Sequence, residues 1–183
     1  MDCVIIRCDS DLNKINENTN ILEFIEYDGL FDVSNLELES VSFTKMNVDA
    51  YTIPSNIKVL SLFDSDFNGC ELNRFVELEE LEITNRIVDV INILNLKKLH
   101  TLNLNFSNIL NADRLCELEL LENISLVDAH FENFDFLFNL KNIKSVIVSE
   151  DDYFKNKEVF LELSKKGIFV LNMMGGAFND LWF

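Results

Sequence analysis

The sequence is poor in the residues that interrupt or crosslink a chain. Its 183 residues include one proline, five glycines and four cysteines. So little proline and glycine leaves little room for linkers. A hydrophobic content of 48%, with 16 phenylalanines, is too high for a disordered chain. A chain of this length is therefore expected to fold as one domain with a substantial core.

Basic residues are also scarce. The chain has 15 Lys and Arg residues against 32 Asp and Glu residues, which gives a net charge of −17. This balance argues against binding to nucleic acid, whose phosphates must be met by Lys and Arg, and against an anionic membrane surface. It favours a basic protein partner, because opposite charge speeds encounter. The alternative is that the charge only keeps a Leu- and Phe-rich protein soluble.

Targeting and membrane segments are missing as well. No hydrophobic run approaches the roughly 18 residues needed to span a bilayer. The start, 1–9, has neither the basic segment, the long apolar stretch nor the small-residue cleavage site of a secretory signal. The sequence therefore predicts a cytoplasmic protein that does not bind membranes.

The residues that usually hold metals or form disulfides lack the required spacing. The four cysteines are Cys3, Cys8, Cys70 and Cys116. None of them belongs to a C-x-x-C pair, and His100 and His130 have no ligand spacing either. We therefore predict reduced, mostly buried thiols, no metal and no cofactor.

The sequence does contain a hydrophobic phrase that returns about every 21 or 22 residues. Each clear copy has four apolar residues spaced three apart and a fifth two positions later. These copies span Leu72–Ile83, Ile93–Leu104, Leu115–Leu126 and Leu137–Val148. The spacing of three suits a helical or 3-10 turn, and the final alternation suits a strand. One such unit cannot bury its own apolar side, so the units are expected to stack as a solenoid.

The repeats resemble the leucine-rich repeat family, specifically its short subclass typified by a protein-phosphatase regulatory subunit. The resemblance covers 36–150 well and both ends poorly. The L-x-x-L-x-L-like cores begin at Leu38, Ile57, Leu78, Leu99, Leu121 and Ile143. The resemblance implies an α/β fold. It would be a right-handed solenoid with one parallel sheet on the concave side and short helical or 3-10 segments on the convex side.

One family position differs in this chain. The family usually has Asn three residues after the second strand leucine, where its side chain bonds the loop backbone. The corresponding residues here are Ser65, Arg86, Ser107, Ala129 and Asp151. The apolar position two residues later is kept, so the stacked core is expected but the Asn bonding in the loops is not.

One loop imitates a metal site. Asp64–Gly69 copies the first half of an EF-hand calcium loop. That loop needs a bidentate Glu at its twelfth position and usually an apolar residue at its eighth. The residues at these positions are Phe75 and Glu71. We interpret the segment as a turn between repeats.

The single domain, 1–183, divides into three parts. Residues 1–35 are predicted to be an N-terminal cap with a short edge strand at Val4–Ile6, and 36–150 are the regular repeats. Residues 151–183 are predicted to be a C-terminal cap.

The C-terminal cap has two predicted elements and a tail. Apolar residues at helical spacing from Tyr153 to Lys166 stop before Gly167, which predicts a helix. Ile168–Leu171 is predicted to be a final strand. The tail, Met173–Phe183, is predicted to form a lid on the last repeat; its aromatic end could instead be a docking peptide.

In the fold that the resemblance implies, residues between and beside the strand leucines point outward. They form three columns: Ser40, Val59, Glu80, Thr101, Asn123, Ser145; Ser42, Ser61, Glu82, Asn103, Ser125, Ile147; and Thr44, Phe63, Thr84, Asn105, Val127, Ser149. These columns contain no Lys, Arg, His or Cys. Beside them, at the strand-to-loop edge, run Asp64, Asn85, Phe106, Asp128 and Glu150.

This surface is the predicted binding site for a protein partner. The predicted contact residues are Phe63, Asp64, Glu80, Glu82, Asn103, Asn105, Phe106, Ser125, Val127, Asp128, Ile147 and Glu150. Apolar side chains beside an acidic rim suit interface anchors. The alternative is that Ser, Thr and Asn merely tolerate an exposed sheet and that Phe106 turns inward.

The sequence shows no catalytic constellation. It has no nucleophile elbow, P-loop, Rossmann glycine turn or H-E-x-x-H motif, so an enzyme is only a remote alternative. By analogy with the family, we predict a non-catalytic protein-binding module, monomeric when free. A small acidic repeat protein suggests an inhibitor, such as an immunity protein against a basic toxin. The alternative is a regulatory or adaptor subunit of an intracellular enzyme.

Overall fold

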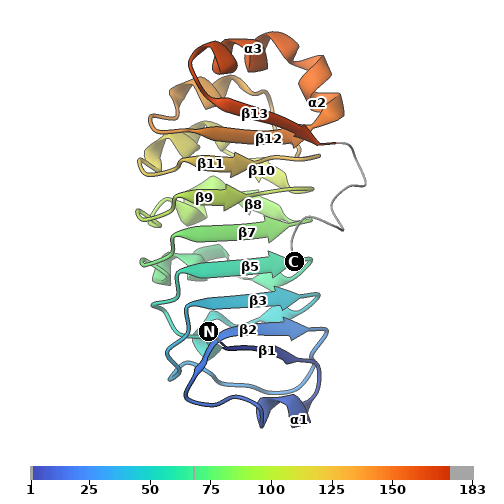
Figure 1. Cartoon of the computed structure of the whole chain (residues 1–183), viewed down its shortest axis with the longest axis vertical. Helices are drawn as coiled ribbons and strands as arrows, with labels where there is room; N and C mark the ends of the chain where they lie inside the picture. Colours follow the sequence, from blue (N-terminus) through green and yellow to red (C-terminus); the bar gives the residue numbers. More distant parts are fainter. Residues whose placement is uncertain (1, 68, 174–183) are drawn as a thin grey trace.

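The repeats place one parallel sheet on one side of the molecule (Figure 1). The computed structural model describes residues 2–67 and 69–173, and within them the sheet has nine strands. In spatial order they are β1 (Asp2–Ile6), β2 (Thr19–Ile25), β3 (Ser40–Thr44), β5 (Val59–Phe63), β7 (Glu80–Thr84), β9 (Thr101–Asn103), β11 (Asn123–Ser125), β12 (Ser145–Ser149) and β13 (Phe169–Met173). Because neighbouring strands are parallel, each coil returns across the opposite side before the next strand begins.

The return path of each coil consists of tight turns. The 3-10 segments are η1 (Ala50–Thr52), η2 (Gly69–Arg74), η3 (Val90–Ile93), η4 (Ala112–Glu117) and η5 (Asp135–Asn139). Short strands also pair on this path, β4 (Asn47–Val48) with β6 (Asp66–Phe67) and β8 (Ile87–Asp89) with β10 (Asn108–Leu110). The predicted α/β leucine-rich repeat solenoid is therefore confirmed.

The strand register agrees with the predicted columns. Glu82 pairs with Ser61 on one side and Asn103 on the other, and Ile147 pairs with Ser125. Residues that the repeat pattern placed on the outer side of the sheet therefore lie side by side there. The face formed by the three outward columns is called the concave face below.

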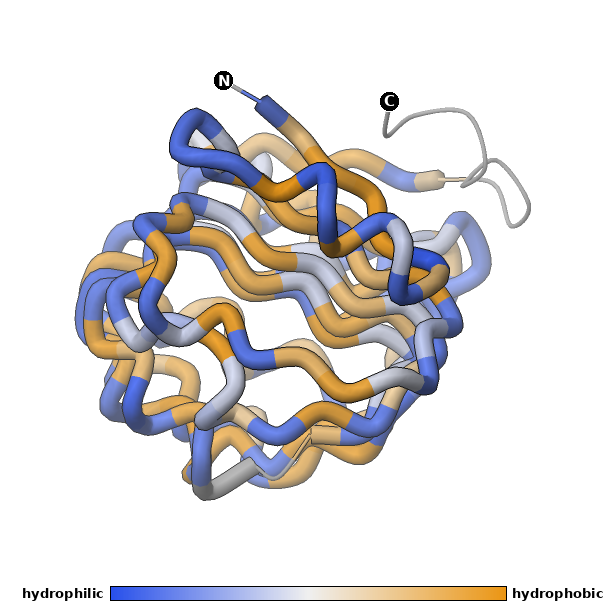
Figure 2. Tube along the Cα trace, turned by 90° about the horizontal axis from the view of Figure 1, so that it is seen from below, coloured by the Kyte–Doolittle hydropathy of each residue, from blue (hydrophilic) through white to orange (hydrophobic). Residues whose placement is uncertain are grey.

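The strand leucines and the apolar residues of the turns form one core. All six predicted core starts are buried: Leu38, Ile57, Leu78, Leu99, Leu121 and Ile143. The cluster extends from Val4 in β1 to Leu163 near the C-terminal end. Viewed along the stack, the coils enclose one common interior (Figure 2). The apolar turn residues, which are spaced three apart in each repeat, thus point into the same core as the strand leucines.

The two ends differ from the regular repeats. The predicted edge strand lies within β1, and a short helix, α1 (Asp9–Leu12), follows it. At the other end, the predicted helix is split into α2 (Glu150–Lys155) and α3 (Lys157–Lys165), because Asn156 has a non-helical backbone. Gly167 has a φ of +86°, which fits the predicted glycine stop.

The last strand and the tail complete the C-terminal end. The predicted final strand corresponds to β13. The predicted lid or docking peptide begins at Met173, the last residue of β13, and its remaining residues, 174–183, lie outside the described residues. Within the described ranges, no helix has the length and hydrophobicity needed to cross a bilayer.

Candidate protein-binding face

The concave face is polar and acidic. Its outward columns contain no Lys or Arg between Ser40 and Ser149. Glu80 and Glu82 on β7 occupy its centre, where Glu80 is exposed and Glu82 is half-buried. Phe63 at the end of β5 is also half-buried, as is Ile147 on β12. The face therefore combines central carboxylates with an apolar side chain on either side along the solenoid.

Glu82 has the most altered chemistry on this face. The Asn103 side-chain N–H donates to Glu82 Oε1 at 2.6 Å. Burial raises the pKa of Glu82 to about 7, and the hydrogen bonds from Ser61 and Asn103 oppose that rise only in part. Near neutral pH, both the charged and the neutral form of the Glu82 carboxyl group are therefore populated. A cation from a partner would favour the charged form.

Four predicted contact residues are buried, so the prediction that they project into solvent is wrong. Asn103 is 8% exposed, Asn105 1%, Ser125 9% and Val127 0%. β9 and β11 end at Asn103 and Ser125, so positions 105 and 127 lie beyond the strands. There, Asn105 Oδ1 accepts hydrogen bonds from Ser125 Oγ at 2.8 Å and from the Val127 N–H at 2.7 Å. These polar groups bond neighbouring coils to each other.

The strand-to-loop edge has a repeated left-handed backbone conformation. The residues that follow successive strands with φ between 48° and 59° are Glu26, Lys45, Asp64, Asn85, Phe106 and Asp128. This region is uncommon for residues other than Gly, Asn and Asp. Phe106 is 43% exposed in this conformation, so it does not turn into the core. Glu150, the last residue of the predicted row, instead begins helix α2.

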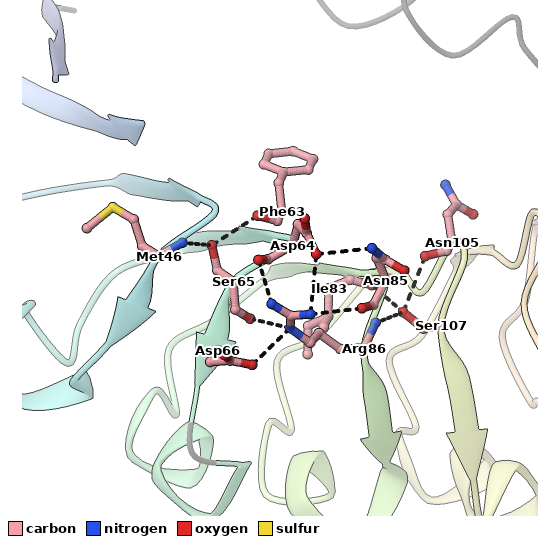
Figure 3. A network of polar contacts seen from close by, with 10 residues as sticks. All are labelled: Met46, Phe63, Asp64, Ser65, Asp66, Ile83, Asn85, Arg86, Asn105 and Ser107. Atoms are coloured by element: carbon pink, nitrogen blue, oxygen red, sulfur yellow. Dashed lines mark hydrogen bonds and ion pairs between the residues drawn. The ribbon is translucent and has the colours of Figure 1, made fainter. Parts of the chain in front are cut away.

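Serine takes over the loop bonding at two of the positions where the family has Asn (Figure 3). Ser65 is 1% exposed, and its Oγ accepts from the Met46 N–H at 3.1 Å and donates to the Phe63 carbonyl at 3.0 Å. Ser107 is equally buried, and its Oγ donates to the Ile83 carbonyl at 3.1 Å. The hydroxyl groups thus satisfy backbone groups in the loops.

Arg86 stands at the corresponding position of the coil between them and bonds backward to the preceding coil (Figure 3). Its Nε donates to the Ser65 carbonyl at 3.1 Å, and its Nη2 donates to the Asp64 carbonyl at 2.5 Å. Its guanidinium also pairs with the Asp64 and Asp66 carboxylates, at 3.3 and 3.1 Å. The two acidic side chains of the calcium-like motif are therefore engaged by an arginine. Sequence reasoning noted Arg86 as a departure from the family but missed this role.

We expect Arg86→Ala to lower the free energy of unfolding by about 1–3 kcal/mol, because it removes the donors to two backbone carbonyls in a partly buried site. Urea denaturation followed by circular dichroism measures the loss. Arg114→Ala is the matched control. Arg114 pairs with Glu117 at the surface, where a pair contributes about 0–1 kcal/mol. Equal losses in the two variants would show that Arg86 acts as an ordinary surface charge.

Comparisons with known proteins agree with this architecture. No protein-family model matches the chain, and no curated protein matches it. It is similar to the structure of an internalin C2 from Listeria monocytogenes, with a TM-score of 0.57 and 25% identity, covering 72% of this chain and 62% of that one. It is also similar to an internalin, InlF, from the same organism, with a TM-score of 0.60 and 19% identity, covering 86% of this chain and 49% of that one. The chain thus spans less than two thirds of the length of either protein.

The repeat register, the nine-stranded parallel sheet and these structural neighbours show that the chain has the leucine-rich repeat solenoid fold. Its fold is similar to that of the two internalins. The fold presents a long open sheet, on which side chains from successive coils form one continuous surface.

Proposed function

We propose that this protein is a non-catalytic module that binds a protein partner through the concave face and its acidic edge. One observation carries the proposal. Glu80 and Glu82 stand at the centre of the face, and no Lys or Arg occupies its outward columns from Ser40 to Ser149. With a net charge of −17, such a face favours a basic partner and a salt-sensitive association rate.

Accessible apolar side chains supply the anchors of the proposed interface. Phe63 and Ile147 are half-buried on the face, and Phe106 is 43% exposed at its edge. Side chains of this kind contribute most to binding when a partner removes them from water. Asp128 and Glu150 extend the acidic rim beside them. Four predicted contact residues are buried and are therefore left out of the proposed contact set: Asn103, Asn105, Ser125 and Val127.

We further propose that the protein is an inhibitor or immunity protein that acts in the cytoplasm and is monomeric when free. A face of this charge would neutralise a basic toxin or enzyme by covering its cationic surface. Cys3, Cys8 and Cys116 are free thiols, which suits a reducing compartment. The prediction that the thiols are mostly buried is wrong for Cys3 and Cys8, which are exposed. A regulatory or adaptor subunit would use the same face, so the identity of the partner decides between the two roles.

Affinity capture from the source cells, followed by binding kinetics with the purified partner, tests this proposal. We expect Glu82→Lys to slow association by about tenfold at low salt, because it reverses a charge at the centre of the face. Phe63→Ala is expected mainly to raise the dissociation rate, by about tenfold, because it removes an anchor.

Glu119→Lys is the matched control for the charge reversal. Glu119 is an exposed residue outside the concave face, where it pairs with Lys141, so this variant should bind like the parent. If Glu82→Lys and Phe63→Ala fold normally and also bind like the parent, the contact lies elsewhere and the proposal is wrong.

A further inference from the structure

The short strands of the return path are interrupted at one place. β4 pairs with β6, and β8 pairs with β10, but in the described part of the chain these two small sheets are not joined to each other. The concave sheet, by contrast, is continuous from β5 to β7 in the same two coils. The gap between β6 and β8 is called the seam below.

Arg86 gives a physical reason for the seam. Elsewhere in this row, the Asp66 N–H bonds the Met46 carbonyl at 2.7 Å, and the Asn108 N–H bonds the Arg86 carbonyl at 2.8 Å. By the same register, the acceptor for the first residue of β8 would be the Ser65 carbonyl. That carbonyl accepts a hydrogen bond from the Arg86 guanidinium. The Arg86 side chain therefore takes the place of the backbone hydrogen bond that would join β6 to β8.

A cavity of about 650 Å³ lies along the seam. The two coils beside the seam line it, with Phe67 from one and Ile87, Val88 and Ile93 from the other. The next two coils also contribute, with Phe106, Asn108 and His130. Its volume falls within the range of about 300–1,000 Å³ that is usual for ligand sites, and its lining combines apolar with polar residues. Among the lining residues, Ile87 is 72% exposed and Phe106 43% exposed. The cavity therefore meets solvent at apolar side chains.

The charged groups around the cavity are mostly acidic. Asp66, Asp89 and Arg86 line it, and Asp64 pairs with Arg86 from beside it. Two of these carboxylates, Asp64 and Asp66, pair with the guanidinium, and the Asp66 side chain remains 73% exposed. The Asp89 carboxylate accepts hydrogen bonds from the Ile91 N–H and the Asn111 side chain. Because Arg86 already faces two carboxylates, an acidic ligand would gain little from it. A cation placed near Asp66 or Asp89 would be attracted.

We infer that the seam binds a short segment of the protein partner in which a large apolar or aromatic side chain stands next to Lys or Arg. The apolar side chain would occupy the gap between Phe67 and Ile87, and the basic one would meet Asp66 or Asp89. This inference rests on the proposed function and deepens it. The seam adjoins the acidic edge of the concave face and gives the same partner a second, more apolar point of contact.

The test uses a defined peptide and the whole chain. Acetyl-Lys-Phe-Lys-amide is titrated into the ¹⁵N-labelled protein, and amide shifts are followed by NMR. We expect saturable shifts at Phe67, Ile87, Val88 and Asp89. Acetyl-Lys-Gly-Lys-amide has the same charge without the anchor and should bind at least about tenfold more weakly, because no apolar side chain is buried. Acetyl-Glu-Phe-Glu-amide should bind more weakly still.

Two variants, each of which replaces an exposed apolar residue by lysine, test where the peptide binds. Ile87→Lys places a charge in the cavity lining and should weaken binding of the Lys-Phe-Lys peptide by at least about tenfold. Leu120→Lys makes the same kind of change at a residue that is 43% exposed and lines a different cavity, so it should leave binding unchanged. Equal binding of the Phe and Gly peptides, equal effects of the two variants, or no shifts at the seam would each overturn the inference.

The outcomes also separate this inference from the proposed function. Amide shifts confined to Ser61, Glu80 and Glu82 would refute binding at the seam but would agree with binding at the concave face. Saturable shifts at the seam, combined with unaltered partner binding by Glu82→Lys and Phe63→Ala, would support the seam and refute the concave face.

Discussion

Truncating Leu102 to alanine is expected to lower the free energy of unfolding by about 2–5 kcal/mol, the range for a large-to-small change in a packed core. Leu102 is fully buried in β9, and its neighbours in the sheet are Leu81 on β7 and Ile124 on β11. The coils on both sides pack against it, so the surrounding structure cannot close the cavity without moving two repeats. Ile124→Ala should produce a loss in the same range.

Urea denaturation of the parent and the two variants measures this effect. Leu110→Ala is the matched control, because Leu110 is 45% exposed on β10 and surface substitutions usually change stability by no more than about 0.5 kcal/mol. A loss at Leu102 as small as that of the control would mean that the strand register is wrong at the centre of the solenoid.

Replacing Glu82 by glutamine is expected to raise stability in a pH-dependent way. The raised pKa of about 7 means that the folded state holds the Glu82 proton more tightly than the unfolded chain does. As the pH rises from about 4.5 to 7, the unfolded chain therefore releases this proton first. The free energy of unfolding falls over that window. The Gln side chain does not titrate, so the variant escapes this loss.

The difference in stability between Glu82→Gln and the parent should therefore grow by about 1–3 kcal/mol between pH 5 and pH 8. Denaturant melts at a series of pH values measure it. Glu80→Gln is the matched control, because it removes one carboxylate from an exposed position on the same strand. A difference that stays constant with pH, or one that Glu80→Gln reproduces, would show that Glu82 is not desolvated as the structure indicates.

Stabilisation of the Glu82 variant at neutral pH would also bear on function. A half-buried, partly ionised carboxyl at the centre of a face without basic residues lowers the stability of the free protein when it is charged. A residue that lowers the stability of the free protein is a candidate for a role in binding. The pH dependence of partner binding would then follow the same group, because a bound cation favours its charged form.

The repeat pattern was enough to predict the solenoid and the alignment of its columns, and the family resemblance implied the parallel sheet. Equivalent positions in successive repeats assign Leu102 and Ile124 to neighbouring coils, and Ser61, Glu82 and Asn103 to one row. This succeeds because the face on which a residue lies depends on the local backbone period, which is two in a strand and near three in these turns. Repetition at about 21 or 22 residues then fixes which positions stack.

The exposure and the pKa of residues in the candidate site depend on contacts between coils, which the repeat pattern does not specify. Asn105 and Val127 have the pattern of outward strand residues, yet β9 and β11 end before them, and their hydrogen bonds join residues 20 to 22 positions apart. The pKa of Glu82 also depends on neighbouring coils, because it is raised by the extent to which they exclude water from the carboxyl group.

Local sequence therefore determined which residues face the core and which face outward, because that choice follows from backbone geometry within one repeat. Only the tertiary structure decided how exposed the outward residues are and how the coils are joined. Arg86 illustrates the difference. The sequence identifies it as an exception at an Asn position, but its bonds to Ser65 and Asp64 in the preceding coil, and the seam beside it, arise from distances between atoms in separate repeats.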